Sequence, residues 1–332
     1  MSGEVAAPVL EVEGLDVATG STALLSQVSF SIDAGERVGL IGESGSGKSL
    51  TALAVMGLLA DGVYVRGHVR LHGGPENLLE HSARQWAAVR GEEMSMVFQE
   101  PMTALNPTMR VGAQVAEVIR LHRGVSRAEG LRRADDVLEQ VGLEAAQTSR
   151  AYPHQLSGGQ RQRVVVAIAL ACDPRLLICD EPSTALDVTV QARVLDEIVS
   201  GVASRQAALL FITHDLAVVA QVCERVLVMY GGRIVEAGPV REVFAEPRHH
   251  YTAGLLAASD LSAVEPGAAL PTIEGTVPAA GQLPTGCVFR TRCPAADEAC
   301  EDQPPWTARA PGSAPSEAFG YACMHPAGET DE

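Results

Sequence analysis

Lysine is almost absent from this 332-residue sequence: of its 25 lysine and arginine residues, only Lys48 is a lysine. Aromatic residues are also scarce, at 4%, so aliphatic side chains must form most of the core. The formal net charge is −16, and no run of basic residues offsets it. These shortages exclude a basic surface for nucleic acid and disfavour direct adsorption to anionic lipid.

Long hydrophobic runs are missing as well. The most apolar stretches, Leu50–Ala60 and Val164–Cys172, are far shorter than the roughly 20 residues needed to span a bilayer. The first four residues, Met-Ser-Gly-Glu, lack the basic and apolar regions of a signal peptide. We therefore expect a cytoplasmic protein that meets the membrane only through a partner.

A phosphate-binding P-loop is the most informative stretch that the sequence does contain. Residues 42–49 read Gly-Glu-Ser-Gly-Ser-Gly-Lys-Ser and match G-x-x-x-x-G-K-[ST]. We expect a short buried strand at 38–41 before the loop and a helix at 50–59 after it. In such a turn, backbone N–H groups converge on phosphate oxygens, and the helix N-terminus adds partial positive charge. The loop positions that we assign to nucleotide binding are Gly42, Ser44, Gly45, Gly47, Lys48 and Ser49.

The two polar side chains of this loop have distinct expected roles. Lys48 would reach the β- and γ-phosphates, and the Ser49 hydroxyl would ligate Mg²⁺. The alternative is a strand–turn–helix corner that binds nothing. The retention of the single lysine at this position argues against that alternative, because the planar fork of arginine cannot replace a compact ammonium group.

Two further stretches resemble parts of a nucleotide site. The apolar residues 176–179 are followed at once by Asp180 and Glu181. Asp180 at the end of such a strand can hold Mg²⁺, and Glu181 is placed to polarise water. Residues 157–160, Ser-Gly-Gly-Gln, open a helix and offer a second N-terminus that can bind an anion.

Strands and helices alternate along the chain, which predicts an α/β fold with a mainly parallel central sheet. We expect strands at 209–213 and a hairpin at 226–235, and two helices joined near Gly124 between residues 110 and 142. Residues 63–71 predict a pair of strands around Gly67. The domain boundary is expected near residue 258, with one domain at 1–257, which holds an antiparallel β subdomain and a helical subdomain at about 103–160, and a loop-rich extension at 258–332.

In their order, these motifs resemble the ATPase subunits of ABC transporters over residues 9–255. The resemblance identifies the P-loop as Walker A, residues 156–160 as the signature, and Asp180-Glu181 as Walker B. It adds a Q-loop residue, Gln99, a D-loop at 184–187 and a switch histidine, His214.

The family resemblance implies a head-to-tail dimer of two ATPase subunits. The P-loop of one subunit and the signature residues Ser157 and Gly159 of the other would then clamp each ATP, with Asp187 close by. Glu181 would be the general base and His214 would contact the γ-phosphate. Gln99 would sense the metal ion and water, so that the expected Mg²⁺ site comprises Ser49, Gln99 and Asp180.

Finer features resemble the importers of oligopeptides, dipeptides and nickel. These are the Q-loop segment 98–107, the segment 246–252 and the cysteine-containing segment 286–294. The sequences of the Q-loop and Walker A resemble the first of the two ATPases in such systems, the dipeptide- or oligopeptide-type "D" subunit. The implied partners are a homologous second ATPase subunit, two transmembrane permease subunits and, indirectly, a substrate-binding protein. The protein would lie at the cytoplasmic face of the membrane. A nickel or other small-solute importer remains an alternative, as does a soluble ABC ATPase without a transport role.

One departure from the family concerns the adenine ring. ABC ATPases usually stack adenine on an aromatic residue upstream of the P-loop, yet residues 15–25 contain none, and Ala18 or Thr19 occupies the expected place. By analogy with base stacking, this loss would cost about 1–3 kcal/mol. We therefore predict nucleotide binding with poor selectivity for the base.

Four cysteines lie together in the C-terminal extension, at the spacing C-x5-C-x6-C-x22-C. In a reducing cytosol they are better candidates for metal ligands than for disulfides. Structural zinc sites usually use closer pairs, whereas four thiolates from a loop-rich segment suit an iron–sulfur cluster. The family resemblance implies a [4Fe-4S] cluster on Cys287, Cys293, Cys300 and Cys323, with zinc as the alternative and His325 as a substitute ligand.

Overall fold

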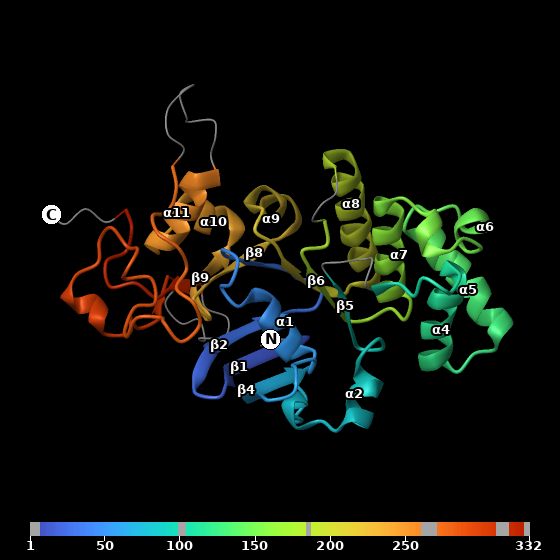
Figure 1. The fold of residues 1–332 in the computed structure, drawn as a ribbon, viewed down its shortest axis with the longest axis horizontal. Helices are drawn as coiled ribbons and strands as arrows, with labels where there is room; N and C mark the ends of the chain where they lie inside the picture. The colour runs from blue at the N-terminus through green and yellow to red at the C-terminus, as the bar shows by residue number, and fades with distance from the viewer. Residues whose placement is uncertain (1–6, 99–103, 184–186, 260–270, 310–318, 329–332) are drawn as a thin grey trace, which may run out of the picture. The chain divides into compact units, whose positions relative to one another are not determined.

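The structure, a computed structural model, describes residues 7–98, 104–183, 187–259, 271–309 and 319–328. The chain forms two compact units, shown in Figure 1. The first unit contains residues 1–31, 37–79 and 212–332, and the second contains residues 32–36 and 80–211. Both units combine strands with helices, which confirms the predicted α/β class, although the sheets are mixed rather than purely parallel.

A three-stranded sheet opens the first unit. Its order is β2 (Thr22–Ile32), β1 (Leu10–Thr19) and β4 (Val63–Leu71), and β1 pairs with β4 antiparallel. The predicted pair of strands around Gly67 is wrong, because β4 runs unbroken through this residue. Gly67 has φ +110°, and a Cβ there would lie 2.6 Å from the backbone oxygen of Gly14. The glycine therefore lets β4 pass a bulge in β1 instead of ending a strand.

The larger sheet of the first unit has the order β10 (Thr307–Ala308), β11 (Gly320–Tyr321), β9 (Arg233–Pro239), β8 (Arg225–Tyr230) and β3 (Arg37–Ile41). Strands β3 and β8 are parallel, whereas β8 and β9 form the predicted antiparallel hairpin. Two short strands of the C-terminal extension, β10 and β11, continue the sheet beyond β9. The helices of this unit are α1 (Lys48–Val55), α9 (Leu216–Val222), α10 (Val240–Ala245) and α11 (His250–Ser259).

The second unit has strands in the order β7 (Ala208–Ile212), β6 (Leu176–Asp180) and β5 (Met94–Val97), with β5 and β6 parallel. Every residue of β6 and β7 is buried, as expected for strands covered on both faces. Its helices are α2 (Ala83–Val89), α4 (Val111–Arg123), α5 (Arg127–Gln140), α6 (Ala145–Thr148), α7 (Gly158–Leu170) and α8 (Val188–Arg205). Figure 1 shows α7 and α8 side by side, and the two helices are in contact.

Two helix boundaries in the second unit illustrate how local signals act. Gly124 ends α4 in the left-handed conformation, so the predicted break between two helices is confirmed. Helix α2 was not predicted, although Ser82 and Gln85 form a capping box at its start that the sequence could have revealed.

No helix in the described part of the chain is long and apolar enough to cross a membrane.

Candidate functional site

The P-loop connects β3 to α1 and can be built only from glycine at two points. A Cβ on Gly42 would lie 2.2 Å from the backbone oxygen of Met229, and a Cβ on Gly47 would lie 2.6 Å from Leu25. Both glycines also have positive φ angles, 152° and 108°, which side chains disfavour. Because only glycine fits at these two points, the loop can adopt the tight curl that points successive N–H groups towards one centre.

The unique lysine lies inside this curl. Lys48 is 6% exposed, and its Nζ donates hydrogen bonds to the backbone oxygens of Gly42 at 2.6 Å and Glu43 at 3.0 Å. Ser49, the predicted Mg²⁺ ligand, is exposed in the first turn of α1. A positive side chain and an exposed hydroxyl at a helix N-terminus are the donor set that a nucleotide triphosphate with its metal ion requires.

The hairpin between β8 and β9 supports the loop from outside. The backbone N–H of Gly232 donates to the oxygen of Ser46 at 2.9 Å, and the Gly232 oxygen accepts from Ser26 N–H at 2.9 Å. One glycine thus joins the P-loop to β2, which fixes the loop relative to the small sheet.

His214 belongs to the same unit as the P-loop. It follows β7 and is exposed, and its neighbour Thr213 donates a backbone hydrogen bond to the oxygen of Leu40 at 3.3 Å. Because Leu40 lies in β3, directly before the P-loop, the predicted switch histidine is placed near the end of the strand that carries the phosphate loop.

The predicted Walker B residues lie in the second unit, at the end of β6. Asp180 is 7% exposed, and the half-buried Glu181 has φ +47°. A left-handed conformation costs a residue with a Cβ about 1–2 kcal/mol, and such strain is concentrated at functional sites. The strained backbone at Glu181 is therefore consistent with a functional residue at this position.

The signature residues begin α7 in the same unit. Ser157 caps the helix by accepting a hydrogen bond from Gln160 N–H at 3.3 Å, and Gln160 reaches back to Ser157 N–H at 2.9 Å. A Cβ on Gly159 would lie 2.3 Å from Val190 of α8, so only glycine allows the two helices to approach. Asp187 caps α8 by accepting from Val190 N–H at 3.0 Å.

The structure thus gathers the predicted site residues into two groups. Residues of the P-loop and His214 lie in the first unit, and Asp180, Glu181, Ser157, Gly159 and Asp187 lie in the second. Gln99 and the D-loop residues 184–186 lie outside the described residues, so their assigned roles stay predictions.

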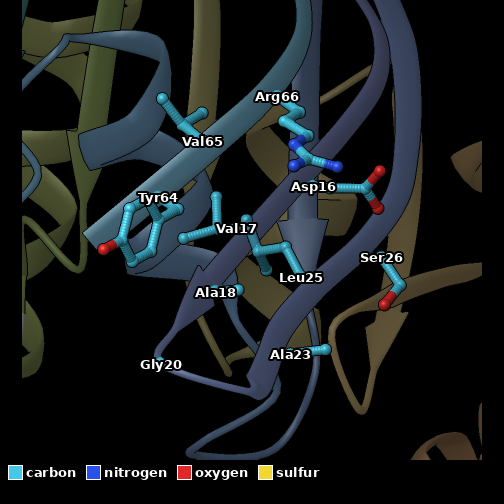
Figure 2. Close-up of a pocket in the computed structure, with 10 residues that line it drawn as sticks. All are labelled: Asp16, Val17, Ala18, Gly20, Ala23, Leu25, Ser26, Tyr64, Val65 and Arg66. Atoms are coloured by element: carbon cyan, nitrogen blue, oxygen red, sulfur yellow. The ribbon is translucent and has the colours of Figure 1, made fainter. Parts of the chain in front are cut away.

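A pocket of about 570 Å³ lies on the small sheet, close to the segment that lacks the expected aromatic residue. Figure 2 shows its lining, which includes Ala18, Leu25, Tyr64 and Arg66. Leu25 also lies next to Gly47 of the P-loop, so the pocket lies beside this loop. Tyr64 of β4 pairs with Ala18 of β1 and is 66% exposed. It places an aromatic ring beside the position where residues 15–25 contain none.

The four C-terminal cysteines form no disulfide bonds, and neighbouring cysteines affect the pKa of three of their thiols. Burial raises the pKa of the Cys287 and Cys293 thiols and raises that of Cys323 to about 11, and the charges of neighbouring cysteines add to each shift. The Cys287 N–H also donates to the Cys300 oxygen at 3.0 Å. The fold therefore collects four thiols whose negative forms repel one another, a situation that a bound cation would reverse.

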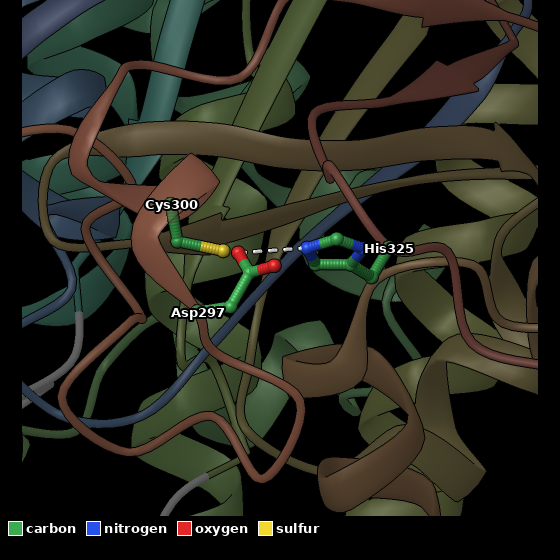
Figure 3. A group of neighbouring side chains, drawn as sticks. All are labelled: Asp297, Cys300 and His325. Atoms are coloured by element: carbon green, nitrogen blue, oxygen red, sulfur yellow. Dashed lines mark ion pairs between the residues drawn. The ribbon is translucent and has the colours of Figure 1, made fainter.

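A smaller group of side chains that could bind a metal ion lies within this region (Figure 3). Asp297, Cys300 and His325 place one ligating atom each within 4.8 Å of one another, the only such trio among the described residues. The Nε2 atom of His325 lies 2.9 Å from Asp297 Oδ1, and this contact lowers the pKa of the Asp297 carboxyl. The participation of Asp297 was missed from the sequence, since an aspartate three residues before a cysteine carries no distinctive signal.

Two other residues missed from the sequence touch the P-loop itself. The Glu43 N–H donates to the hydroxyl of Tyr251, and the Glu43 carboxylate is held by Arg292 of the C-terminal extension. No spacing rule could have linked residues more than 200 positions apart.

Comparisons with known proteins agree with the motif order. The ABC transporter family profile matches residues 25–184, and the profile described as oligopeptide/dipeptide transporter, C-terminal region, matches residues 235–300. The chain is 48% identical to the probable D,D-dipeptide transport ATP-binding protein DdpD of Escherichia coli (strain K12), over 91% of this chain and 93% of that one. It is 46% identical to the oligopeptide transport ATP-binding protein OppD of Salmonella typhimurium, over 92% and 91% of the two chains.

Solved structures match as well. CbiO1 from Clostridium perfringens, part of the ABC transporter complex cbiONQ, has a TM-score of 0.62 and 27% identity, covering 72% of this chain and 92% of that one. The ATP-binding cassette MJ0796, solved as a dimer in a post-hydrolysis state with ADP and Pi, has a TM-score of 0.62 and 26% identity, covering 70% and 99%. The resemblance predicted from the motifs is thereby confirmed, and the chain belongs to the ABC transporter ATP-binding proteins, within the group that carries the oligopeptide/dipeptide transporter C-terminal region.

Proposed function

We propose that this ABC ATPase powers the import of di- or oligopeptides across the cytoplasmic membrane. The observation that carries the proposal is the C-terminal match at residues 235–300, which is separate from the ABC transporter match at 25–184 and is described as oligopeptide/dipeptide transporter, C-terminal region. Relatives of nearly equal length are named for transport of the same solutes. A nickel or other small-solute importer is the alternative, since an ATPase subunit does not itself touch the solute.

The catalytic unit in this proposal is a head-to-tail pair with a second ATPase subunit. Ser157 and Gly159 of one subunit would bind the nucleotide held by the P-loop of the other. Ser157 and Gly158 at the start of α7 are exposed, which supports this assignment because the helix N-terminus is then accessible to an anion. Two permease subunits, contacted through the Q-loop region including residues 102–107, would hold the ATPase at the cytoplasmic face of the membrane.

Hydrolysis is assigned to residues of the chain as follows. Lys48 binds and orients the terminal phosphates, and Glu181 takes the proton of the attacking water. His214 contacts the γ-phosphate, and Gln99 orients the water. Mg²⁺ would be held by Ser49, Asp180 and Gln99, where it neutralises phosphate charge. A carboxylate that is 7% exposed at the end of an apolar strand fits such a cation.

The cysteine site is proposed to hold a [4Fe-4S] cluster on Cys287, Cys293, Cys300 and Cys323, as a structural support for the C-terminal extension. Four mutually interacting thiols fit a group that binds thiolates. Zinc is the second candidate, which the compact trio of Asp297, Cys300 and His325 specifically favours.

The decisive experiment is purification of the protein from membranes with its permease partners, followed by identification of the bound solute and measurement of uptake in proteoliposomes. We expect peptide uptake that requires ATP and that Lys48→Ala abolishes. An ATPase that is active but purifies without any membrane protein would instead support the soluble, non-transport alternative. Uptake of nickel but not of peptides would replace the solute assignment while keeping the ATPase role.

A further inference from the structure

Side chains from the C-terminal part of the chain form hydrogen bonds with Glu43, the second residue of the P-loop. Arg292 donates to both carboxylate oxygens of Glu43, from Nη1 at 2.6 Å and from Nη2 at 3.1 Å. The Tyr251 hydroxyl accepts from the Glu43 N–H at 2.6 Å. Together these bonds fix both the backbone and the side chain of Glu43.

Arg292 is itself held rigidly. Its side chain is 4% exposed. Its Nε donates to the Glu274 oxygen at 2.8 Å, and its Nη2, which also donates to Glu43, lies 3.2 and 3.3 Å from the oxygens of Ile273 and Gly275. A guanidinium group that is buried and fully engaged loses little freedom when it forms a bidentate pair. The C-terminal extension therefore holds Arg292 in the position from which it binds Glu43.

The turn that carries Arg292 also carries two of the cysteines. Within residues 287–293, Arg290 N–H donates to the Cys287 oxygen and Arg292 N–H to the Phe289 oxygen, at 3.1 and 2.9 Å. The Phe289 ring packs on Tyr230 and Tyr251, with centroids 5.1 and 5.4 Å apart. Any displacement of this turn must therefore move Arg292.

Glu43 in turn shapes the phosphate site. Its backbone oxygen accepts from Lys48 Nζ at 3.0 Å and from Ser46 N–H at 3.2 Å. Its side chain is 30% exposed and carries a negative charge on a loop that must bind phosphates. Arg292 neutralises that charge, so that without Arg292 the carboxylate would repel the nucleotide and the loop would lose an anchor.

We propose that Arg292 is a positioning residue of the nucleotide site, which makes the cysteine-bearing C-terminal turn a structural part of the P-loop. The inference rests on the proposed role of this loop in ATP binding. It extends that role, because the position of the turn at 287–293 then determines how tightly the P-loop binds nucleotide.

The test is a titration of MgATP into the full-length protein by calorimetry, with wild type, Arg292→Met, Glu43→Gln and the double variant. We expect Arg292→Met to weaken ATP binding by about tenfold, within the usual 5–150-fold range of coupling between sites. Glu43→Gln in the same chain should restore affinity to within about threefold of wild type, because it removes the charge that Arg292 neutralised. Steady-state kinetics should show a raised KM with a nearly unchanged kcat.

Arg290→Met is the matched control. It deletes the same charge from the same turn, but its partner is Glu301, at 3.3 Å, and not the P-loop. ATP affinity within about twofold of wild type is expected. Hydrogen exchange at residues 43–47 should accelerate in Arg292→Met and stay unchanged in Arg290→Met, which separates positioning from a general loss of folding.

Cys293→Ser extends the test to the cysteines. It should weaken ATP binding in the wild-type background and have no further effect in the Arg292→Met background. Equal affinities in wild type and Arg292→Met, or a double variant no better than Arg292→Met alone, would overturn the proposal. If wild type and Lys48→Ala bind ATP equally, the assigned role of the P-loop fails instead, and the two failures are thereby distinguished.

Discussion

His249 should make the stability of the first unit depend on pH in a way that can be calculated. Its side chain is 1% exposed, and its Nδ1 accepts a hydrogen bond from Tyr251 N–H at 3.1 Å. Burial, aided by the nearby His250, lowers the pKa of His249 from 6.5 to about 3. The folded protein therefore keeps this ring neutral at a pH where the unfolded chain protonates it.

Proton linkage gives the direction in which the free energy of unfolding changes with pH. Between pH 6.5 and 3 the unfolded state binds more protons at this position than the folded state, so the free energy of unfolding falls as the pH falls. The stabilisation is complete above the unfolded pKa. Between pH 7.5 and 5.5 the expected loss is about 1 kcal/mol, because the unfolded ring gains a proton with a pKa of about 6.5 while the folded ring does not.

The comparison protein is His249→Asn, whose side-chain oxygen can accept from Tyr251 N–H but cannot be protonated. Glu236 accepts from His249 N–H at 2.9 Å, and burial raises the pKa of its carboxyl. A raised carboxyl pKa acts in the opposite direction, stabilising the fold at low pH and losing this effect as the pH rises. Because Glu236 is present in both proteins, the difference between them isolates His249.

The assay is urea unfolding at pH 7.5 and 5.5, followed by tryptophan fluorescence. The chain contains two tryptophans, and Trp86→Phe leaves Trp306 of the C-terminal extension as the only reporter. Wild type should lose about 1 kcal/mol more than His249→Asn between the two pH values. An equal loss in the two proteins would refute the claim that the ring stays neutral in the folded state.

The remaining predictions concern the chemistry of the sites. Glu181→Gln should bind ATP but lower turnover by at least about 10²-fold, the effect of a lost general base; wild-type turnover in the assembled transporter would refute its role. Lys48→Arg should impair hydrolysis nearly as severely as Lys48→Ala, since the guanidinium is wider than the 2.6–3.0 Å contacts of the ammonium allow, and MgATP should protect Lys48 from an amine-selective reagent. ATP and GTP should bind within about tenfold of each other, a difference of about 1.4 kcal/mol; a stronger preference for ATP that Tyr64→Ala removes would assign base stacking to Tyr64. Protein purified without oxygen should be brown and contain about four irons per chain, and Cys293→Ser should bleach it, whereas one zinc and no iron would establish the zinc alternative.

Much of the nucleotide chemistry could be read from the sequence because it depends on local geometry. The loop at 42–49 needs glycine at fixed offsets, and the structure shows a local reason at Gly42 and Gly47, whose positive φ angles disfavour any side chain. The break at Gly124 was predictable for the same reason, since a left-handed residue ends a helix through its own backbone. Apolar strands such as β6 were evident because both of their faces are buried.

Other features depend on residues that meet only after the chain has folded. The continuity of β4 through Gly67 is set by a bulge in β1, more than 50 residues earlier. The trio of Asp297, Cys300 and His325 forms only when the last described residues return to the turn at 297–300. The pair between Glu43 and Arg292 spans 249 positions. Local propensity carries no record of such partners, because burial and charge compensation between distant segments arise only when tertiary packing brings them together.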